Sequence, residues 1–393
     1  MKDRQVAAAL AAIGLVAYVV TTFGETTVFD YFGRLAVAIT QGHLWLDGAP
    51  PHLNELATGT GGHQYSAVPP LPAILIIPLL PFGPPATLQT LLSAAAGGLI
   101  AAPLYLGQRA LGVPAGLALG TSIFSIFGTG LWITAVDGRS WFAAGAIGTF
   151  FLSLAFWCAA ARGPWIILGA LLGAAILSRL PMALALPGLL LLASRGDIRA
   201  AIRALPPVAL GLAPFLAVQG AYNLARWGTI GDAGYAILVE NDPFYPHGLF
   251  DVRYVPRHLY ALFFEPPSLV ESDPFFLRAR SIGMSVLVTA PPLLWIARAA
   301  TNGRTLWATA PLALACLPLL PDIVYGGIGF EQYGYRRSLD ILPFLVALAT
   351  IGGGWTGSAW LPRGTPLFRA ALVVSVLINV YFLIEIHRFG YAR

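Results

Sequence analysis

Charged residues are scarce in this chain. They make up 10% of its 393 residues, whereas hydrophobic residues make up 57%. An ionisable side chain at the centre of a membrane helix costs roughly 2.5–3.5 kcal/mol, so a chain that avoids charge is suited to a bilayer. The composition therefore indicates a polytopic membrane protein, and no stretch of the sequence has the character of a separate soluble domain.

Lysine and cysteine are also rare. Lys2 is the single lysine against 22 arginines, and the net charge of +5 is spread along the chain, which gives no reason to expect a nucleic-acid partner. Cys158 and Cys316 lie in apolar runs. They are better interpreted as small buried hydrophobic residues than as a disulfide or metal ligands. The sequence also lacks a Walker loop, a GxGxxG motif after a strand and a GxSxG elbow.

Long apolar runs dominate what is present. We expect an all-α polytopic membrane protein that forms one membrane domain over residues 1–393, with about eleven transmembrane helices. The expected spans are 5–23, 86–106, 113–132, 141–160, 165–178, 181–193, 206–225, 281–297, 306–321, 339–352 and 367–386. The run 69–82 is short and holds five prolines, so we interpret it as an interfacial or re-entrant segment. No cleavage site follows the first run, which indicates a retained helix.

The charges choose an orientation for these spans. With a cytoplasmic N-terminus, eleven bases and only two acids fall on the cytoplasmic side, as the positive-inside rule requires. The bases are Lys2, Arg4, Arg109, Arg162, Arg195, Arg199, Arg203, Arg298, Arg304, Arg363 and Arg369, and the acids are Asp3 and Asp197. The other sixteen acids and all six histidines fall on the outer side. We therefore expect functional groups in the outer loops.

Three outer loops carry most of these groups, namely residues 24–70, 226–280 and 322–338. In the first loop, Phe32, Leu35, Ala36 and Ile39 recur at helical spacing. This pattern predicts an amphipathic helix over 31–41 that lies flat on the bilayer. Asp30 would stand at its N-terminus, where a carboxylate is favoured and held in orientation.

The order of several short motifs along the chain is informative. An acidic residue after the first span is followed by the flat helix and then by Tyr65-x-x-x-Pro69-Pro70. Far downstream, a Gly/Tyr-rich loop ends in Arg336-Arg337, before a helix that runs Leu-Pro-Phe. This order resembles the integral-membrane glycosyltransferases of the C-type fold, such as the protein mannosyltransferases and the aminoarabinose transferases. The resemblance extends from Glu25 to about Phe344.

The resemblance implies a lipid-linked sugar donor and a catalytic acid in the first loop. Many relatives carry two adjacent acids there, whereas Glu25 and Asp30 are five residues apart. We expect Asp30 to be the general base that deprotonates an acceptor hydroxyl, a role worth roughly 10²–10⁴-fold in rate. Glu25 is the alternative base. Asp30 could instead serve only as a helix cap or as a partner of Arg34.

Arginine is suited to holding the phosphate of such a donor, because its fork of donors pairs with phosphate oxygens. Arg336 and Arg337 are the first candidates, although neighbouring residues on a helix point about 100° apart, so that a single one of them could be the residue that reaches the site. Arg179 and Arg257 are further candidates. The alternatives are interfacial snorkelling or pairing with loop acids such as Glu331 and Asp340.

Acceptor or sugar contacts are expected from a third group, which comprises Asp137, Tyr65, Tyr333, Tyr335 and His258. A membrane aromatic belt would place tyrosines at similar positions, and Asp137 could simply pair with Arg139. No cofactor is expected. A divalent metal is conceivable but unsupported, since the spacing of His43, His52 and His63 with Asp47 and Glu55 fits no standard ligand pattern.

We therefore expect a glycosyltransferase in a bacterial inner (plasma) membrane with its active site on the outer face. It would move a monosaccharide, with inversion, from a polyprenyl-phosphate donor to a hydroxyl of a lipid, glycan or protein acceptor. A lipid or glycan transporter is the main alternative, but transporters place polar groups at the membrane midplane. A non-catalytic assembly subunit is the third possibility.

Overall fold

The computed structural model describes residues 3–240, 242–270, 276–301, 305–354 and 364–392. Lys2, Arg304 and Arg363, which were counted on the cytoplasmic side, lie outside the described residues. The chain is mostly helical, and its strands form two short two-stranded sheets. This confirms the expectation of a helical membrane protein.

Six helical stretches of the described chain are long and apolar enough to cross a membrane, or seven if a bent pair is one span. They are α1 (Asp3–Val20), α4–α5 (Pro85–Ala110), α8 (Ser140–Ala160), α12 (Leu205–Trp227), η7–α19 (Arg336–Gly354) and α20 (Pro366–Phe389). The bent pair is α6 (Ala115–Phe127) with α7 (Leu131–Asp137), and its two parts meet at 43°. The prediction of eleven spans is therefore not confirmed.

The other expected spans are broken into short helices. They appear as α9 (Trp165–Ile176), η3 (Leu180–Ala185), α10 (Leu186–Ala193), α15 (Val286–Thr289), η5 (Pro291–Trp295), α16 (Ile296–Ala299), α17 (Leu306–Leu314) and α18 (Leu319–Ile323). Proline explains several of the breaks, because it lacks the N–H that would continue a helix. Pro181 and Pro291 each stand at the start of a 3₁₀ turn. Length alone no longer identifies these segments as separate spans.

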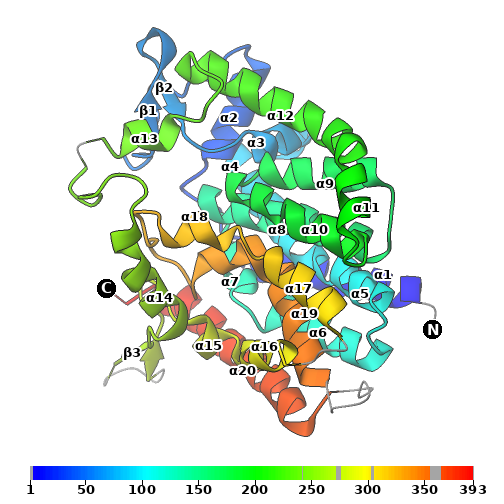
Figure 1. Cartoon of the computed structure of the whole chain (residues 1–393). Coiled ribbons are helices and arrows are strands. Elements are labelled where there is room, and N and C mark those ends of the chain that lie inside the picture. The colour runs from blue at the N-terminus through cyan, green and yellow to red at the C-terminus, as the bar shows by residue number, and fades with distance from the viewer. Residues whose placement is uncertain (1–2, 241, 271–275, 302–304, 355–363, 393) are drawn as a thin grey trace.

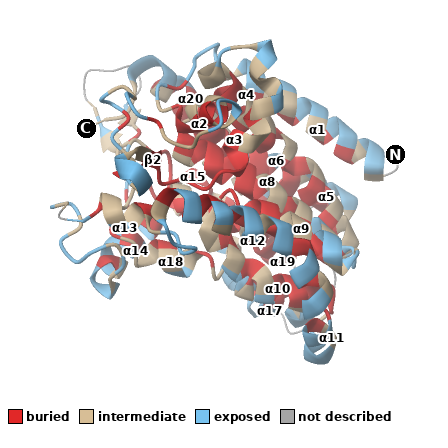
Figure 2. Ribbon diagram, turned by 90° about the horizontal axis from the view of Figure 1, so that it is seen from above, coloured by how far each residue is buried: buried red, intermediate tan, exposed pale blue. Residues whose placement is uncertain are grey.

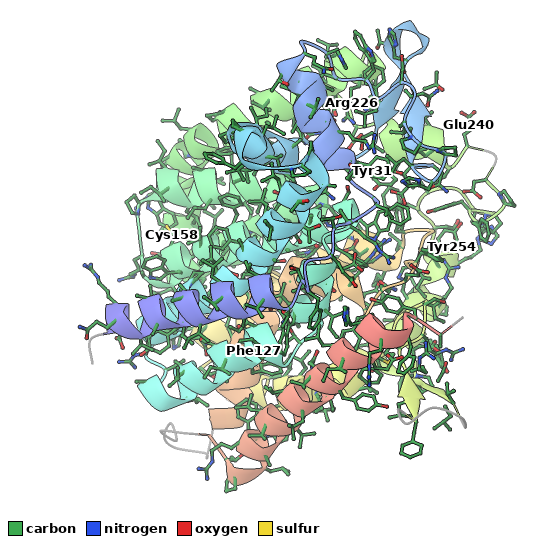
Figure 3. The ribbon with its side chains drawn as sticks, turned by 180° about the vertical axis from the view of Figure 1, so that it is seen from behind. Tyr31, Phe127, Cys158, Arg226, Glu240 and Tyr254 are labelled. Carbon is green, nitrogen blue, oxygen red and sulfur yellow. The ribbon has the colours of Figure 1, made fainter. Side chains whose placement is uncertain are left out.

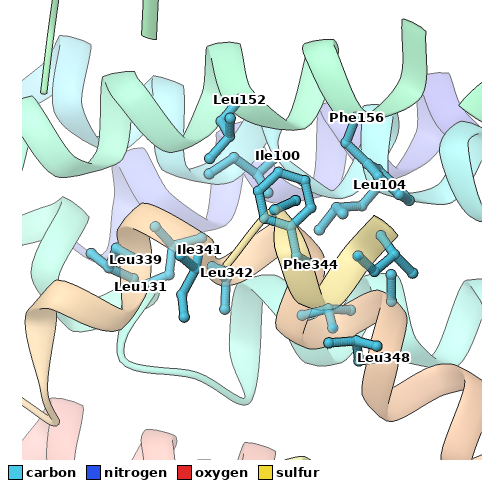
Figure 4. Packing of buried hydrophobic residues seen from close by; sticks show 14 of the residues in the cluster. Ile100, Leu104, Leu131, Leu152, Phe156, Leu339, Ile341, Leu342, Phe344 and Leu348 are labelled. Atoms are coloured by element: carbon cyan, nitrogen blue, oxygen red, sulfur yellow. The ribbon is translucent and has the colours of Figure 1, made fainter. Parts of the chain in front are cut away.

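The hydrophobic core lies where the central helices cross. Phe156 on α8 meets Phe344 on α19 with ring centroids 6.3 Å apart, and Ile100 and Leu104 are fully buried beside them (Figure 4). Burial is concentrated along this centre, whereas α1 and much of α12 present exposed residues (Figure 2). Exposed apolar helix faces are what a surrounding bilayer would cover.

Glycine allows the peripheral helices to approach the core closely. A Cβ on Gly98 of α4 would lie 2.4 Å from the carbonyl oxygen of Gly14 on α1. A Cβ on Gly211 of α12 would lie 2.0 Å from the carbonyl oxygen of Ile166 on α9. Small residues of this kind drive helix packing in membranes, where burial of apolar surface gives little net gain. Both contacts explain why glycine occurs in the interior of these helices.

The non-spanning segments gather at one end of the helices, which we call the loop end (Figure 1). They include α2 (Tyr31–Thr40), β1 (Leu56–Thr58), η1 (Thr60–Gly62), β2 (Gln64–Ser66), α13 (Gly234–Leu238), η4 (Val252–Tyr254), α14 (Val255–Phe263), β3 (Ser268–Leu269) and β4 (Leu277–Arg278). The N-terminus and α11 (Ile198–Arg203) lie at the opposite end (Figure 1). The predicted segregation of loops is thus visible in the fold.

The helix predicted over 31–41 forms, but its surroundings differ from those expected. The apolar residues Phe32, Leu35 and Ala36 of α2 are fully buried. They pack against α3 (Leu71–Ile76), η2 (Ile77–Phe82) and α4. The amphipathic pattern of α2 is therefore explained by packing on the protein, and no free apolar face is left for the bilayer.

Candidate functional site

A short hairpin at the loop end positions Glu55, which directly precedes β1. Strands β1 and β2 pair antiparallel, with Leu56 opposite Ser66. The backbone N–H of Glu55 donates a hydrogen bond of 2.9 Å to the hydroxyl of Tyr31 at the start of α2. Glu55 is therefore fixed between the hairpin and α2, two elements that the chain brings together across 24 residues.

A buried arginine holds this hairpin against α12. The guanidinium of Arg226 donates to the carbonyl oxygen of Ser66, and the hydroxyl of Thr60 donates to the carbonyl oxygen of Arg226 at 3.0 Å. Arg226 is completely buried, and its guanidinium lies over the rings of Tyr222 (3.6 Å) and Trp227 (4.7 Å). Figure 3 labels Arg226 and Tyr31 close together at the loop end. Arg226 is therefore a buried structural residue that holds the hairpin against α12.

Glu55 and Arg336 influence each other electrostatically, and neither side chain has a hydrogen-bond or ion-pair partner among the described residues. Burial raises the pKa of Glu55, and the charge of Arg336 offsets part of this rise. Atom Nη1 of Arg336 is buried and unbonded, and the guanidinium lies 5.7 Å from the ring of Trp141 and 5.6 Å from that of Phe142. An unpaired buried donor is costly, so such a site is suited to a ligand.

Arg337, next in the chain, is paired. Its Nη1 lies 2.7 Å from Asp322, and its Nη2 donates to the carbonyl oxygen of Gly327 at 2.5 Å. Arg179 makes a two-pronged contact with Asp340, at 3.1 and 2.6 Å, and also lies 3.6 Å from Asp322. These four residues form one buried network of two arginines and two aspartates, which leaves Arg336 as the surplus cation beside it.

Three tyrosines surround the same region. The ring of Tyr325 meets those of Tyr235 and Tyr245 edge-on, with centroids 6.2 and 5.9 Å apart. The hydroxyls of Tyr245 and Tyr325 are 3.4 Å apart. The charge of Glu55 acts on all three rings, and burial raises the pKa of each, to about 12 for Tyr325. The tyrosines therefore remain protonated hydroxyl donors around Glu55.

Helix α14 ties the Gly/Tyr-rich loop in place. His258 is fully buried between the hydroxyl of Tyr335 (Nδ1, 2.7 Å) and the carbonyl oxygen of Tyr325 (Nε2, 2.8 Å). Burial lowers the pKa of His258 to about 4. The neutral ring then donates from Nε2 and accepts from Tyr335 at Nδ1. Arg257 donates to the carbonyl oxygen of Gly326. Both residues predicted as ligand contacts are engaged with the protein itself.

The two acids predicted as the base lie elsewhere. Asp30 stands at the N-terminus of α2 without capping it, and pairs with Arg34 at 2.7 Å. It also lines a cavity of about 420 Å³ beside α2. Glu25 is largely exposed and lies 3.2 Å from His387 at the end of α20. The carboxylate whose charge acts on Arg336 is that of Glu55.

The remaining predicted contacts are dispersed. Asp137 pairs with Arg139 at 3.0 Å, and Arg139 also reaches Glu331 at 2.8 Å. Tyr65 and Tyr333 are both buried. The hydroxyl of Tyr65 donates to the carbonyl oxygen of Thr60, and the ring of Tyr333 packs 5.6 Å from Phe382. Within the described residues, no group of three or more His, Cys, Asp or Glu side chains could hold a metal ion.

The sequence predicts a phosphate-binding role for Arg336, but it does not single out Glu55 or Tyr235. Glu55 was considered only as part of a metal site and set aside because the ligand spacing was wrong. No local pattern in the sequence distinguishes Glu55 from the other acids of the first loop.

No family model matches the chain, and no curated protein matches it. Among the solved structures that are similar to it are two glycosyltransferases. The first is the protein O-mannosyltransferase complex of S. cerevisiae bound to its sugar donor, with 15% identity and a TM-score of 0.41. The match covers 72% of this chain and 38% of the other. The second is the oligosaccharyltransferase of Archaeoglobus fulgidus in its apo form, with 12% identity and a TM-score of 0.46.

The second match covers all of this chain but 56% of its counterpart. The chain therefore spans between about two fifths and just over half the length of these enzymes. At TM-scores below 0.5 the matches assign no role to any residue here.

Proposed function

We propose that this chain is an inverting glycosyltransferase of the cell envelope. It moves a monosaccharide from a polyprenyl-phosphate donor to an acceptor hydroxyl, with its loop end on the outer face and its N-terminus in the cytoplasm. The observation that carries the proposal is the unpaired guanidinium of Arg336, whose charge acts on the half-buried carboxylate of Glu55. A reaction that needs a base and releases a phosphate requires both groups.

The chemistry follows from the two groups. Glu55 accepts the proton of the acceptor hydroxyl, while the hydroxyl oxygen attacks the anomeric carbon of the sugar. The bond between that carbon and the phosphate oxygen breaks, and its electron pair leaves with the polyprenyl phosphate. Arg336 stabilises the charge that develops on this leaving group. One displacement of this kind inverts the anomeric configuration. A raised pKa suits Glu55 to the role of base near neutral pH.

The other predicted residues have supporting roles in this proposal. Arg179 and Arg337 hold Arg336 in position through Asp340 and Asp322, instead of binding phosphate themselves. His258 and Arg257 hold the loop that carries Tyr325. Asp30 remains the alternative base, and its test is separate from that of Glu55.

Lipid binding tests the proposal even though the sugar is unidentified. The protein is purified into nanodiscs, and native mass spectrometry compares the binding of undecaprenyl phosphate with that of undecaprenol. We expect the wild type to prefer the phosphate and Arg336→Gln to lose most of that preference. Arg199→Gln, at the opposite end of the molecule, is the matched control and should behave as the wild type. Equal binding of both lipids by the wild type would contradict the proposal.

A further inference from the structure

A cavity beside α2 is lined by residues that do not belong to the site around Glu55 and Arg336. One face of α2 forms its floor through Asp30, Arg34, Val37, Ala38 and Gln41. These positions are spaced by three or four residues, and so lie on the side of the helix opposite to Phe32, Leu35 and Ala36. The segment 43–49, which we call the covering segment, lines the other side of the cavity, which measures about 420 Å³ and is open to solvent; this volume is within the range of small-molecule sites.

Ring stacking and hydrogen bonds hold the covering segment in place. The ring of Trp45 is stacked between those of His43 and His63, with centroids 4.6 and 4.2 Å away and the planes nearly parallel. Asp47 accepts hydrogen bonds from the ring of His63 (2.5 Å) and from the backbone of Gln64 (2.8 Å). Because Gln64 begins β2, the wall of the cavity is attached to the hairpin that positions Glu55. A ligand in the cavity would therefore be held in fixed relation to that residue.

The lining limits the kind of ligand. Arg34, the only arginine of the lining, pairs through Nε with Asp30 at 2.7 Å, and Asp47 adds a second carboxylate, so the charge of the lining does not favour a phosphate or a carboxylate. The amide of Gln41 and the ring of His43 are in hydrogen-bond contact at 3.2 Å. Two carboxylates, an amide and an imidazole interrupt the apolar residues of the lining, and such a mixed surface is unsuited to a long lipid tail. Planar polar groups beside an aromatic wall are suited to an uncharged ligand rich in hydroxyl groups.

We infer that this cavity binds a neutral saccharide unit of the acceptor. The inference rests on the proposed function and specifies its acceptor as a glycan. Asp30 and Arg34 would exchange hydrogen bonds with sugar hydroxyls, and the covering segment would orient the acceptor toward the hairpin. Asp30 then contributes to acceptor recognition, whereas Glu55 takes the proton.

Binding of free glycosides tests the inference. A panel of neutral methyl hexosides and pentosides is added to the protein in nanodiscs, and binding is followed by saturation-transfer NMR and by tryptophan fluorescence. We expect saturable binding of at least one glycoside. Ala49→Phe, which adds a ring to the cavity lining, and Arg34→Gln should each weaken it by tenfold or more. Thr40→Phe places the same ring on an exposed position of α2 outside the cavity lining and should leave binding unchanged.

The outcomes separate this inference from the proposed function. If no member of the panel binds, or if Ala49→Phe binds as well as the wild type while its thermal unfolding is unchanged, the saccharide site is refuted. In that case Arg336-dependent binding of undecaprenyl phosphate can still stand. If glycosides bind but the phosphate preference is absent, the cavity is supported as a glycoside site, but its role in transfer and the proposed function both fail.

Discussion

Arg336 and Arg337 are adjacent in the chain, yet only Arg337 has carboxylate and carbonyl partners among the described residues. Its guanidinium contacts Asp322 at 2.7 Å and lies 4.3 Å from the ring of Tyr325, whereas that of Arg336 has no hydrogen-bond or ion-pair partner in the same part of the chain. Burial without a partner destabilises a protein, so such a group persists where function requires it. The two arginines should therefore respond in opposite ways to the same substitution.

Arg337→Gln should destabilise the protein, because it leaves Asp322 buried with its main partner removed. Breaking a buried ion pair costs about 3–5 kcal/mol. Arg336→Gln removes an uncompensated charge and should leave the melting temperature unchanged or raise it. Thermal unfolding of both variants in the same detergent measures the difference. Equal losses of stability would mean that Arg336 has a structural partner and is not held free for a ligand.

Glu55→Gln should separate activity from stability in the same way. If Glu55 is the general base that we propose, the variant should lose roughly 10²–10⁴-fold in transfer rate. Its pKa is raised in the folded state, so the unfolded chain loses its proton first as the pH rises, and the folded state is penalised. The variant should thus be more stable than the wild type at neutral pH. The gain should vanish near pH 4, where Glu55 is protonated in both the folded and the unfolded wild type. Unfolding scans across this pH range, with a transfer assay, provide the test.

A loss of stability on Glu55→Gln at neutral pH would instead identify Glu55 as a structural residue. Glu240→Gln is a suitable control, since Glu240 is an exposed acid of the same end of the molecule. It should alter neither the rate nor the melting temperature.

His258 predicts a pH dependence of the loop that carries Tyr325. The pKa of this buried ring is lowered to about 4, so the unfolded state takes up a proton first as the pH falls below its ordinary value near 6.5. Stability should therefore decrease as the pH falls from about 6.5 to about 4, and then level off. His258→Gln should have a flatter profile over this interval. A variant with the same slope as the wild type would show that other groups cause the effect.

The sequence predicted where the loops lie better than it predicted which side chains pair within them. Charge segregation separated the loop end from the N-terminal end, because the cost of burying charge acts on every span. The pairing of Arg179 with Asp340 joins residues 161 apart in the chain, and no local pattern marks it. No local pattern marks the proximity of Glu55 and Arg336 either, because it depends on how the hairpin packs against α12. From the sequence one could predict only that the adjacent residues Arg336 and Arg337 point in different directions.

The predicted number of spans differs from the observed number of long helices for a related reason. Hydrophobicity marks residues that avoid water, but it does not distinguish a straight span from short helices buried among others. Segments such as 281–297 are apolar throughout and still break at Pro291-Pro292 into α15, η5 and α16. The prolines were visible in the sequence and indicated a kink. The degree of breakage depended on the neighbouring helices.

Asp30→Asn tests whether Asp30 or Glu55 is the base. If Glu55 is the base and Asp30 belongs to the saccharide cavity, this variant should raise the KM for the acceptor by about tenfold and leave kcat within a few-fold of the wild type. The loss of the pair with Arg34, one helical turn away, should cost only about 0.3–0.5 kcal/mol of stability. Steady-state kinetics with varied acceptor provide the measurement. If the turnover number instead fell by two or more orders of magnitude while KM stayed the same, proton transfer would belong to Asp30, and Glu55 would lose that role.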